Sequence, residues 1–529
     1  MSTFMNANEG PAEIISKASG FCGGNMPDNA PYFTSNEGIP WPDAAHSKTT
    51  FNRAKTLERM VYPAGSGAFG YFECTKDMSE ITKASLFSHA GKRTPIFARF
   101  STVTFGKEFP DSRRNPRGFA IKHYTDKGNY DVVGLNWPIF FNRDPMQGPD
   151  VVRSQQRNPS NFLLDYNSLF DLLANTPEAN HAGMMLFSDH GTPDGWINMN
   201  GFGCHTFKWV NSSGNFVYVK YHYIAEHGQK QFSWDEAVKK CGEDPDHSKR
   251  QLWSAIERGE RPTWTFKVQI MEPSQADPNK LGFDPFDVTK VWPHHSFPLH
   301  EVGKLVLNKN PKNYHRDVEQ AAFSPGAIVP SIEESPDSLL QFRMFFYRDA
   351  QYHRLGVNLH QVPVNCPFMA KSYSSINPDG ALRSDANAGF NPHYYPNSFV
   401  NKFRPDASET PYQVANNVVS RQSHFFHEGK MPDIAVVLKL VDHDIIKISY
   451  LAQQYNISNE YAQGVYALLP DPGFSFSDVE KMARGAKTMT KEERFAPSVR
   501  LPVFLLFLLK TSHSSLGFLP EFKYSVRYG

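Results

Sequence analysis

A series of short strand-like segments fills residues 65–310 and constrains the fold more than any other feature. Residues 262–271 show the pattern best, because Trp264 and Phe266 fall on one face of a strand and Lys267 on the other. Further strands are predicted at residues 67–75, 94–103, 118–125, 130–141, 205–211, 215–224 and 304–308. Short strands separated by turn residues predict an antiparallel barrel.

The pattern changes along the chain and predicts four parts. Residues 1–50, rich in Gly, Asn, Pro and Ser, are expected to form an extended N-terminal arm, with a disordered tail as the alternative. Residues 51–310 form the barrel domain. Residues 311–430 form a long segment with one good helix, which is expected to wrap around the molecule. Helical patterns return in residues 431–529, which predicts a C-terminal helical domain.

Composition excludes several classes of protein. Among 529 residues, 55 Lys and Arg balance 54 Asp and Glu, so neither nucleic acid nor a membrane is an expected partner. The five scattered cysteines form no Cys-x-x-Cys motif, which argues against a disulfide framework or a zinc site. The apolar run 503–509 is far shorter than the roughly 20 residues of a spanning helix. Without a signal peptide or a Ser-Lys-Leu ending, the cytoplasm is expected and the peroxisome is less favoured.

Residues 341–354 read as a helix that carries a specific arrangement. Arg343 and Tyr347 are one turn apart, and a guanidinium beside a phenol favours the phenolate. Tyrosine is one of the residues that can hold haem iron. Arg354, two turns beyond Tyr347, is placed to meet a haem propionate. The alternative is an ordinary amphipathic helix with solvated arginines.

Four segments in order resemble those of haem catalases. They are residues 59–73, residues 99–103 with 115–120, residues 136–145, and residues 343–356, with further similarity at 391–399. The resemblance covers roughly residues 50–370. It implies the α+β catalase fold, an eight-stranded antiparallel β-barrel with an N-terminal arm, a wrapping loop and a C-terminal helical domain. It also implies a homo-oligomer, either a dimer or a tetramer.

The same resemblance implies haem b and assigns residues to it. Tyr347 is then the iron ligand and Arg343 its charge partner. The residues that would hold the propionates or cover the haem are Arg59, Arg99, Arg354, Val61 and Phe140.

The chain departs from the catalase pattern on the distal side of the haem. Tyr62 stands at the place of the family's histidine, and Leu135 at the place of its asparagine, directly before Asn136. Ser101 matches the family and is expected to hydrogen-bond Tyr62. A phenol with a pKa of about 10 is a poor base at neutral pH, and losing a positioned base costs roughly 10²- to 10⁴-fold. The sequence therefore predicts weak or absent disproportionation of hydrogen peroxide.

Two further changes affect the walls of this pocket. Gly148 stands where catalases usually carry a phenylalanine, and Trp137 where a small polar residue is usual. Two interpretations remain open. Either the pocket is reshaped for a molecule larger than peroxide, or Trp137 fills the gap.

The resemblance also bears on NADPH, which some catalases bind. The positions that match the family's NADPH contacts are His181, Ser188, Asn200, Trp292 and His294. His190 replaces a contact arginine and Ile224 a contact lysine. Two cations that would bind phosphate are thereby lost or weakened, which argues against tight NADPH binding.

A catalase scaffold without the distal pair is similar to catalase-like enzymes of ergot alkaloid biosynthesis in fungi. This similarity implies a haem-dependent oxidoreductase that cyclises and decarboxylates a prenylated N-methyl tryptophan, with a reactive oxygen species such as superoxide as oxidant. The alternatives are a catalase or weak peroxidase, and a haem-binding protein without catalytic activity.

Overall fold

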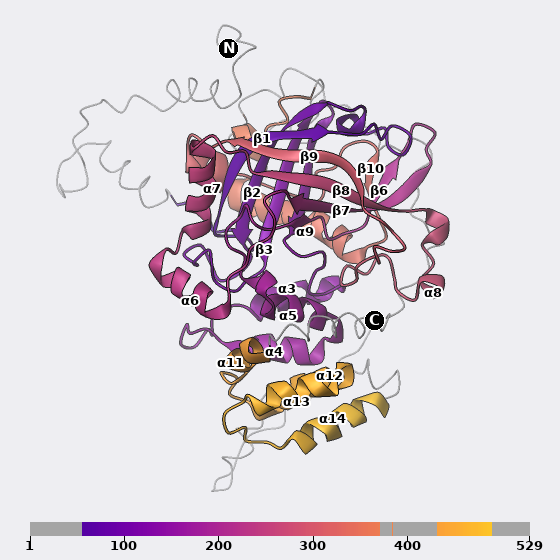
Figure 1. The fold of residues 1–529 in the computed structure, drawn as a ribbon. Helices are drawn as coiled ribbons and strands as arrows, with labels where there is room; N and C mark the ends of the chain where they lie inside the picture. Colours follow the sequence, from indigo (N-terminus) through magenta and orange to yellow (C-terminus); the bar gives the residue numbers. More distant parts are fainter. Residues whose placement is uncertain (1–54, 371–382, 384–430, 489–529) are drawn as a thin grey trace, which may run out of the picture.

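Eight antiparallel strands close into a barrel in the computed structural model, which describes residues 55–370, 383 and 431–488 (Figure 1). Their order around the barrel ends with the pairing of β7 and β8, in which Tyr221 lies opposite Val268. The eight strands are β1 (Gly65–Cys74), β2 (Arg93–Thr102), β3 (Arg117–Thr125), β4 (Gly128–Leu135), β5 (Gly201–Phe202), β7 (Phe216–Ala225), β8 (Thr263–Met271) and β9 (His300–Lys309). The short strands β6 (Phe207–Val210) and β10 (Ile332–Glu334) extend the sheet beside β7.

The barrel is filled by the apolar faces of its strands. Trp264, Phe266 and Val268 of β8 are buried, which confirms the alternation predicted for residues 262–271. Aromatic rings dominate this core, and the ring of Phe266 lies 4.7 Å from that of Tyr223. Each such ring removes a large apolar area from water, so the barrel supplies a rigid frame for side chains at its rim.

Helices gather at one end of the barrel and form a second core (Figure 1). Phe170 and Tyr450 meet there edge to face at 4.9 Å. The helices of this end are α3 (Gly148–Arg153), α4 (Tyr166–Asn175), α5 (Asn180–Phe187), α11 (Met431–Leu438), α12 (Asp444–Ile457), α13 (Asn459–Ala467) and α14 (Phe476–Thr488). Helices α6 (Trp234–Glu243) and α7 (His247–Glu257) flank the barrel, and α8 (Pro278–Leu281) is a single turn.

Helix α9 (Ser338–Leu355) contains the predicted helix of residues 341–354. It begins where the Asp337 carboxylate accepts the amide hydrogen of Leu340 at 3.0 Å, and it ends at Gly356, whose φ is 93°. Arg343, Tyr347 and Arg354 are buried, as their spacing predicts.

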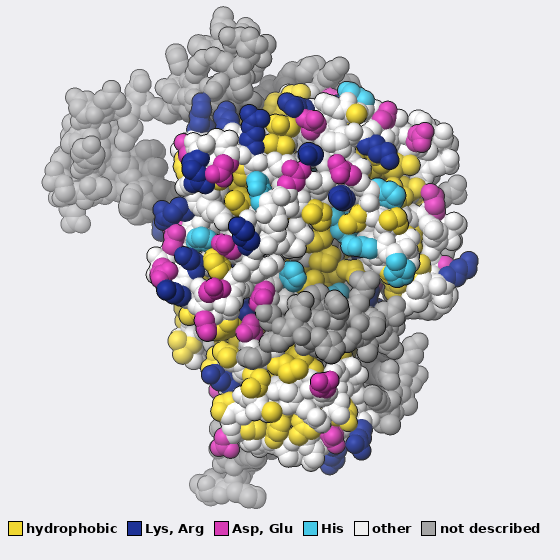
Figure 2. All heavy atoms as spheres, viewed as in Figure 1, with side chains coloured by type: hydrophobic (Ala, Val, Ile, Leu, Met, Phe, Trp, Pro, Cys, Tyr) yellow, Lys and Arg dark blue, Asp and Glu magenta, His cyan; other side chains and the backbone are white. Residues whose placement is uncertain are grey.

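Other predictions differ from the structure or lie outside it. The strand predicted at 130–141 ends at Leu135, and no pattern in the sequence predicts the two-residue β5. Most of residues 1–50, 371–430 and 489–529 lie outside the described part, so the arm and the wrapping loop stay predictions. No helix in the described ranges is long and apolar enough to span a membrane. Charges of both signs alternate over the face in Figure 2, in agreement with the balanced composition.

Candidate active site

Arg343 and Tyr347 of α9 form the base of the site. An Nη atom of Arg343 donates to the Tyr347 hydroxyl oxygen at 3.0 Å and to the backbone oxygen of Val133 at 3.1 Å. The guanidinium also lies 4.3 Å from the ring centre of Phe140. Burial alone would lower the pKa of Arg343, but the phenol oxygens of Tyr347 and Tyr62 outweigh it and raise the pKa. Arg343 is therefore a fixed cation beside the predicted iron ligand.

A histidine and a carboxylate hold Arg343 from behind. His205 Nε2 lies 2.7 Å from the second Nη atom of Arg343, and His205 Nδ1 lies 2.6 Å from Asp337 Oδ2. Burial lowers the pKa of His205, so the ring is neutral, accepts at Nε2 and donates at Nδ1. No pattern in the sequence predicts this arrangement, because 138 residues separate His205 from Arg343 and no local spacing connects them.

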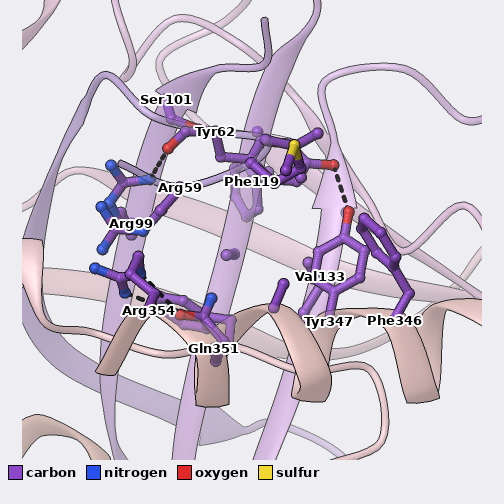
Figure 3. Close-up of a pocket in the computed structure, with 17 residues that line it drawn as sticks. Arg59, Tyr62, Arg99, Ser101, Phe119, Val133, Phe346, Tyr347, Gln351 and Arg354 are labelled. Atoms are coloured by element: carbon purple, nitrogen blue, oxygen red, sulfur yellow. Dashed lines mark hydrogen bonds between the residues drawn. The ribbon is translucent and has the colours of Figure 1, made fainter. Parts of the chain in front are cut away.

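Three buried arginines line the other end of the pocket (Figure 3). Arg59 donates to the backbone oxygens of Val318 and Ala321, and Arg354 donates to the backbone oxygens of Glu319 and Ala321. Arg99 donates to the backbone oxygens of Tyr62 and Pro63, and its buried Nε has no hydrogen-bond partner among the described residues. The chain thus brings together all three arginines that the sequence assigned to the propionates.

The charges of this arginine cluster do not balance. Glu319 is the one carboxylate that forms an ion pair with the cluster among the described residues, at 3.4 Å from Arg59. Burial, followed by repulsion from Arg99 and Arg354, lowers the pKa of Arg59 well below its ordinary value. Burial would raise the pKa of Glu319, but the surrounding cations lower it. A buried excess of positive charge favours a ligand with two negative groups at this end.

Tyr62 faces Tyr347 across the pocket (Figure 3). Their hydroxyl oxygens are 3.2 Å apart, and their ring centres 6.2 Å apart. The backbone of Tyr62 has a φ of 63°, which few non-glycine residues adopt, and its amide is held by the carbonyl of Val103 at 2.9 Å. Burial, followed by the neighbouring phenol of Tyr347, raises the pKa of Tyr62 well above its ordinary value. Tyr62 is therefore a neutral phenol over the whole physiological range.

The other distal residues differ in their placement. Leu135 packs in the same apolar cluster as Tyr62. Ser101 and the Tyr62 ring both contact Gly118, where a Cβ would collide with each of them. The expected hydrogen bond between Ser101 and Tyr62 is absent from the described structure, because the Tyr62 hydroxyl is directed at Tyr347. Leucine cannot form hydrogen bonds, so this distal side offers a peroxide fewer polar partners than a histidine and an asparagine would.

Asn136 is not brought to this pocket. Its side-chain oxygen accepts from the backbone amide of Arg117 at 2.8 Å, and its amide nitrogen donates to the backbone oxygen of His190 at 2.9 Å. It lines a different cavity beside β7. The turn after β4 therefore directs Asn136 and Leu135 to opposite sides of the chain, as consecutive residues of an extended segment are directed.

Two adjoining cavities meet at Tyr62 and Tyr347. The cavity beside the arginine cluster measures about 40 Å³, and the second, which we call the distal cavity, about 400 Å³. Apolar residues form most of the distal cavity's wall, among them Val61, Val103, Leu135, Phe140, Phe342 and Phe346.

Phe342 lies beside Gly148, and both residues line the distal cavity. A Cβ at Gly148 would lie 3.2 Å from the Phe342 ring, and that ring stacks on Phe346 at 5.3 Å. The interpretation that Trp137 fills the gap is wrong. Trp137 packs in the second core and donates from Nε1 to the backbone oxygen of His190 at 3.1 Å.

The donor set fits haem. A phenol paired with a buried arginine can hold ferric iron, and the arginine cluster with its unpartnered Arg99 Nε suits two propionates. Val61 and Phe140 line the cavities next to the tyrosine pair. The geometry adds one requirement. If the Tyr347 oxygen held iron, it would no longer donate to the Tyr62 hydroxyl, and the Tyr62 side chain would turn away from it. The adjacent distal cavity offers room for this movement.

The residues that correspond to NADPH contacts fit that cofactor poorly. His181, Asn200, Trp292 and His294 line one cavity of about 560 Å³, while Ser188 does not line it. Figure 2 shows histidines gathered around an apolar area on this face. Lys220 is the one Lys or Arg among the described lining residues, and it already donates to two backbone carbonyls. A dinucleotide with several phosphates needs more cations than this cavity supplies.

The comparisons with known proteins agree with this geometry. The catalase family model matches residues 43–401. The chain is 47% identical to a catalase of Methanosarcina barkeri over 385 residues, which cover 69% of this chain and 76% of the relative. It is 48% identical to a catalase of Ascaris suum over 369 residues, 70% of this chain and 68% of the relative.

Solved structures of catalases superpose on the chain. A fungal catalase matches with a TM-score of 0.76 and 35% identity, over 84% of this chain and 95% of that structure. Catalase A from Saccharomyces cerevisiae matches with the same score and identity, over 82% of this chain and 95% of that structure. These matches cover the barrel, α9 and both sides of the pocket, and the chain belongs to the catalase family.

Proposed function

We propose that this catalase-family oxidoreductase uses haem to oxidise an organic substrate and that its turnover of hydrogen peroxide is weak. The observation that carries the proposal is the pair of distal residues, a buried neutral phenol at Tyr62 and an apolar Leu135 in the same cluster. Haem, when bound, supplies redox chemistry with oxygen species. What the chain supplies on the distal side is one neutral phenol and an apolar wall.

The distal residues are poorly suited to splitting peroxide. That reaction needs a group that takes a proton from one oxygen and returns it to the other, with a pKa near the working pH. The raised pKa of Tyr62 makes it a proton donor only. Leu135 cannot hold peroxide by a hydrogen bond. The expected loss is on the order of 10²- to 10⁴-fold relative to an enzyme with a positioned base.

We propose a prenylated N-methyl tryptophan as the substrate, cyclised and decarboxylated in a chanoclavine synthase-like reaction with superoxide as oxidant. The support is the sequence resemblance to enzymes of ergot alkaloid biosynthesis. The distal cavity of about 400 Å³ has the size and apolar lining typical of small-molecule sites.

The second candidate is a catalase or weak peroxidase, and the comparisons favour it more directly than they favour the first. Relatives at 47% and 48% identity are named catalases. In that case Tyr62 and Leu135 would have to permit peroxide turnover without a positioned base.

One experiment separates the two candidates. Haem-loaded protein is given hydrogen peroxide in an oxygen electrode, and separately the prenylated N-methyl tryptophan with a superoxide source, with products followed by mass spectrometry. The first candidate predicts oxygen release at least about 10²-fold below that of a catalase with the distal histidine, together with a cyclised product. Oxygen release within about tenfold of such an enzyme would support the second.

Assembly, cofactors and location complete the proposal. We propose a homo-oligomer, a dimer or a tetramer, because catalases of this architecture associate through the arm and the wrapping loop. We also propose a cytoplasmic rather than peroxisomal location, and haem without tightly bound NADPH.

A further inference from the structure

Residues of α4, α5, α6 and α11 line a separate cavity of about 410 Å³. Four aromatic side chains from four segments line it. They are Phe105, Tyr166, Phe187 and Trp234. Two arginines from the loop between β2 and β3, Arg113 and Arg114, also line the cavity and bring positive charge to it. We call this the arginine–aromatic cavity.

The two arginines differ in their partners. Arg114, whose side chain is 7% exposed, pairs with Asp433 at 2.7 Å and lies 4.8 Å from the Trp234 ring centre. Its buried Nε has no hydrogen-bond partner among the described residues. Arg113 stacks over Phe109 at 5.4 Å, and no carboxylate of the described residues forms an ion pair with it. The cavity therefore contains one compensated and one uncompensated cation.

No Asp or Glu is among the described residues that line this cavity. Aromatic walls bind flat apolar groups, and a guanidinium binds a carboxylate through two parallel hydrogen bonds. A volume near 400 Å³ is within the range of small-molecule sites. From these observations we propose that the arginine–aromatic cavity binds an aromatic carboxylate, with the ring between Phe105 and Trp234 and the carboxylate on Arg113.

The arginine–aromatic cavity lies next to the distal cavity of the predicted haem pocket. Gln155, which is 3% exposed, lines both the arginine–aromatic cavity and the distal cavity. Its side-chain oxygen lies 3.3 Å from Thr104 Oγ1, and its amide nitrogen donates to the Val151 backbone oxygen at 3.3 Å. This side chain therefore faces both cavities. The proposed binding does not depend on which reaction the haem pocket performs.

Gly242 in α6 provides a sharp test. It lines the cavity at an exposed position, and a Cβ added there meets nothing within 4 Å, so a larger side chain causes no backbone clash. Gly242→Phe places a ring at the edge of the cavity to obstruct it, and Gly242→Ala is the matched control. Arg113→Gln removes the uncompensated cation. Arg157→Gln, at an exposed arginine outside the cavity, controls for a general loss of charge.

The probes are indole-3-propionate and its neutral methyl ester, titrated calorimetrically into the haem-loaded full chain. We expect one site per chain, with the acid bound at least about tenfold more tightly than the ester, as a hydrogen bond to a charged group predicts. Arg113→Gln should weaken binding of the acid about tenfold and leave binding of the ester unchanged. Gly242→Phe should abolish binding of both, and the two control variants should bind like the parent.

Three outcomes would overturn the proposal. They are the absence of binding heat, equal affinity for acid and ester, and unchanged binding in Gly242→Phe. Occupation of the distal cavity is recognised separately, because it shifts the haem absorption band. If the shift of the haem band saturates at the same probe concentration as the binding heat, and if it persists in Gly242→Phe, the probe binds in the distal cavity. That result rejects the arginine–aromatic cavity as the binding site.

Discussion

The hydroxyl oxygens of Tyr62 and Tyr347 lie 3.2 Å apart, although 285 residues separate them in the chain. Tyr62 itself has a positive φ and lies before β1, and Tyr347 lies in the middle of α9. The pair connects the two faces of the predicted haem pocket directly. Iron binding at Tyr347 would therefore change the position of Tyr62. The chemistry of the pocket would depend on the new orientation of the Tyr62 ring.

Replacing both distal residues should increase peroxide turnover. Tyr62→His with Leu135→Asn provides a base with a pKa near neutrality and a hydrogen-bond donor, so oxygen release should rise at least about 10²-fold. The measurement is oxygen evolution per haem. Tyr62→Phe with Leu135→Asn is the control and should show no comparable rise. An unchanged rate in the first variant would show that the pocket differs more deeply from a catalase.

Tyr347→Phe should weaken haem binding. It removes the phenol oxygen that Arg343 contacts at 3.0 Å and leaves Arg343 facing an apolar ring. We expect a lower haem content after purification and altered ligand bands in the absorption spectrum. Tyr352→Phe, in the same helix but outside the pocket, is the matched control. A full haem content with unchanged bands in Tyr347→Phe would refute the axial assignment.

Stability should fall as the pH decreases from about 6.5 to about 4. Burial lowers the pKa of His123 to about 4, while the unfolded chain titrates near 6.5. The unfolded state therefore binds more protons in this window, and the free energy of unfolding decreases as the pH falls. His123 alone contributes on the order of 3 kcal/mol to this decrease in the free energy of unfolding.

Thermal melts between pH 7 and 4 measure this effect. His123→Gln removes the titrating group from its place between Phe72 and Tyr130 and should flatten the pH dependence of the melting temperature. His295→Gln, at an exposed histidine, is the control and should keep the slope of the parent. An equal slope in all three proteins would contradict the assignment.

Gly148→Phe should destabilise the chain, because the new ring meets Phe342. A Cβ at Gly148 already lies 3.2 Å from that ring, and overpacking typically costs about 1–3 kcal/mol. Phe342→Ala in the same chain should recover most of the loss. A double-mutant cycle in melting temperature provides the coupling. Additive effects of the two substitutions would show that the rings do not share the space.

The sequence was most informative where one local rule decides the outcome. The spacing of Arg343 and Tyr347 placed both on one face of α9, and the alternation along β8 placed Trp264 in the barrel. It failed where distant segments meet. The position of Phe342 over Gly148 and the support of Arg343 by His205 depend on tertiary packing that no spacing encodes.

Very short strands and the orientations of individual side chains could also not be predicted from the sequence. β5 has two residues, too few for any periodicity. Leu135 and Asn136 were assigned to one site, but they lie on opposite sides of the chain because β4 ends between them. The direction of the Tyr62 hydroxyl, towards Tyr347 rather than Ser101, follows from a positive φ that tyrosine rarely adopts.

The arginine cluster has a consequence for how the protein matures in a cell. Three guanidinium groups share Glu319 inside the molecule, so the polypeptide alone folds against its own electrostatic repulsion. A dianionic porphyrin relieves that repulsion, and any ligand that binds only the native state raises its population by mass action. The yield of mature protein should therefore follow the supply of haem during synthesis, and porphyrin-starved cells should degrade much of what they translate.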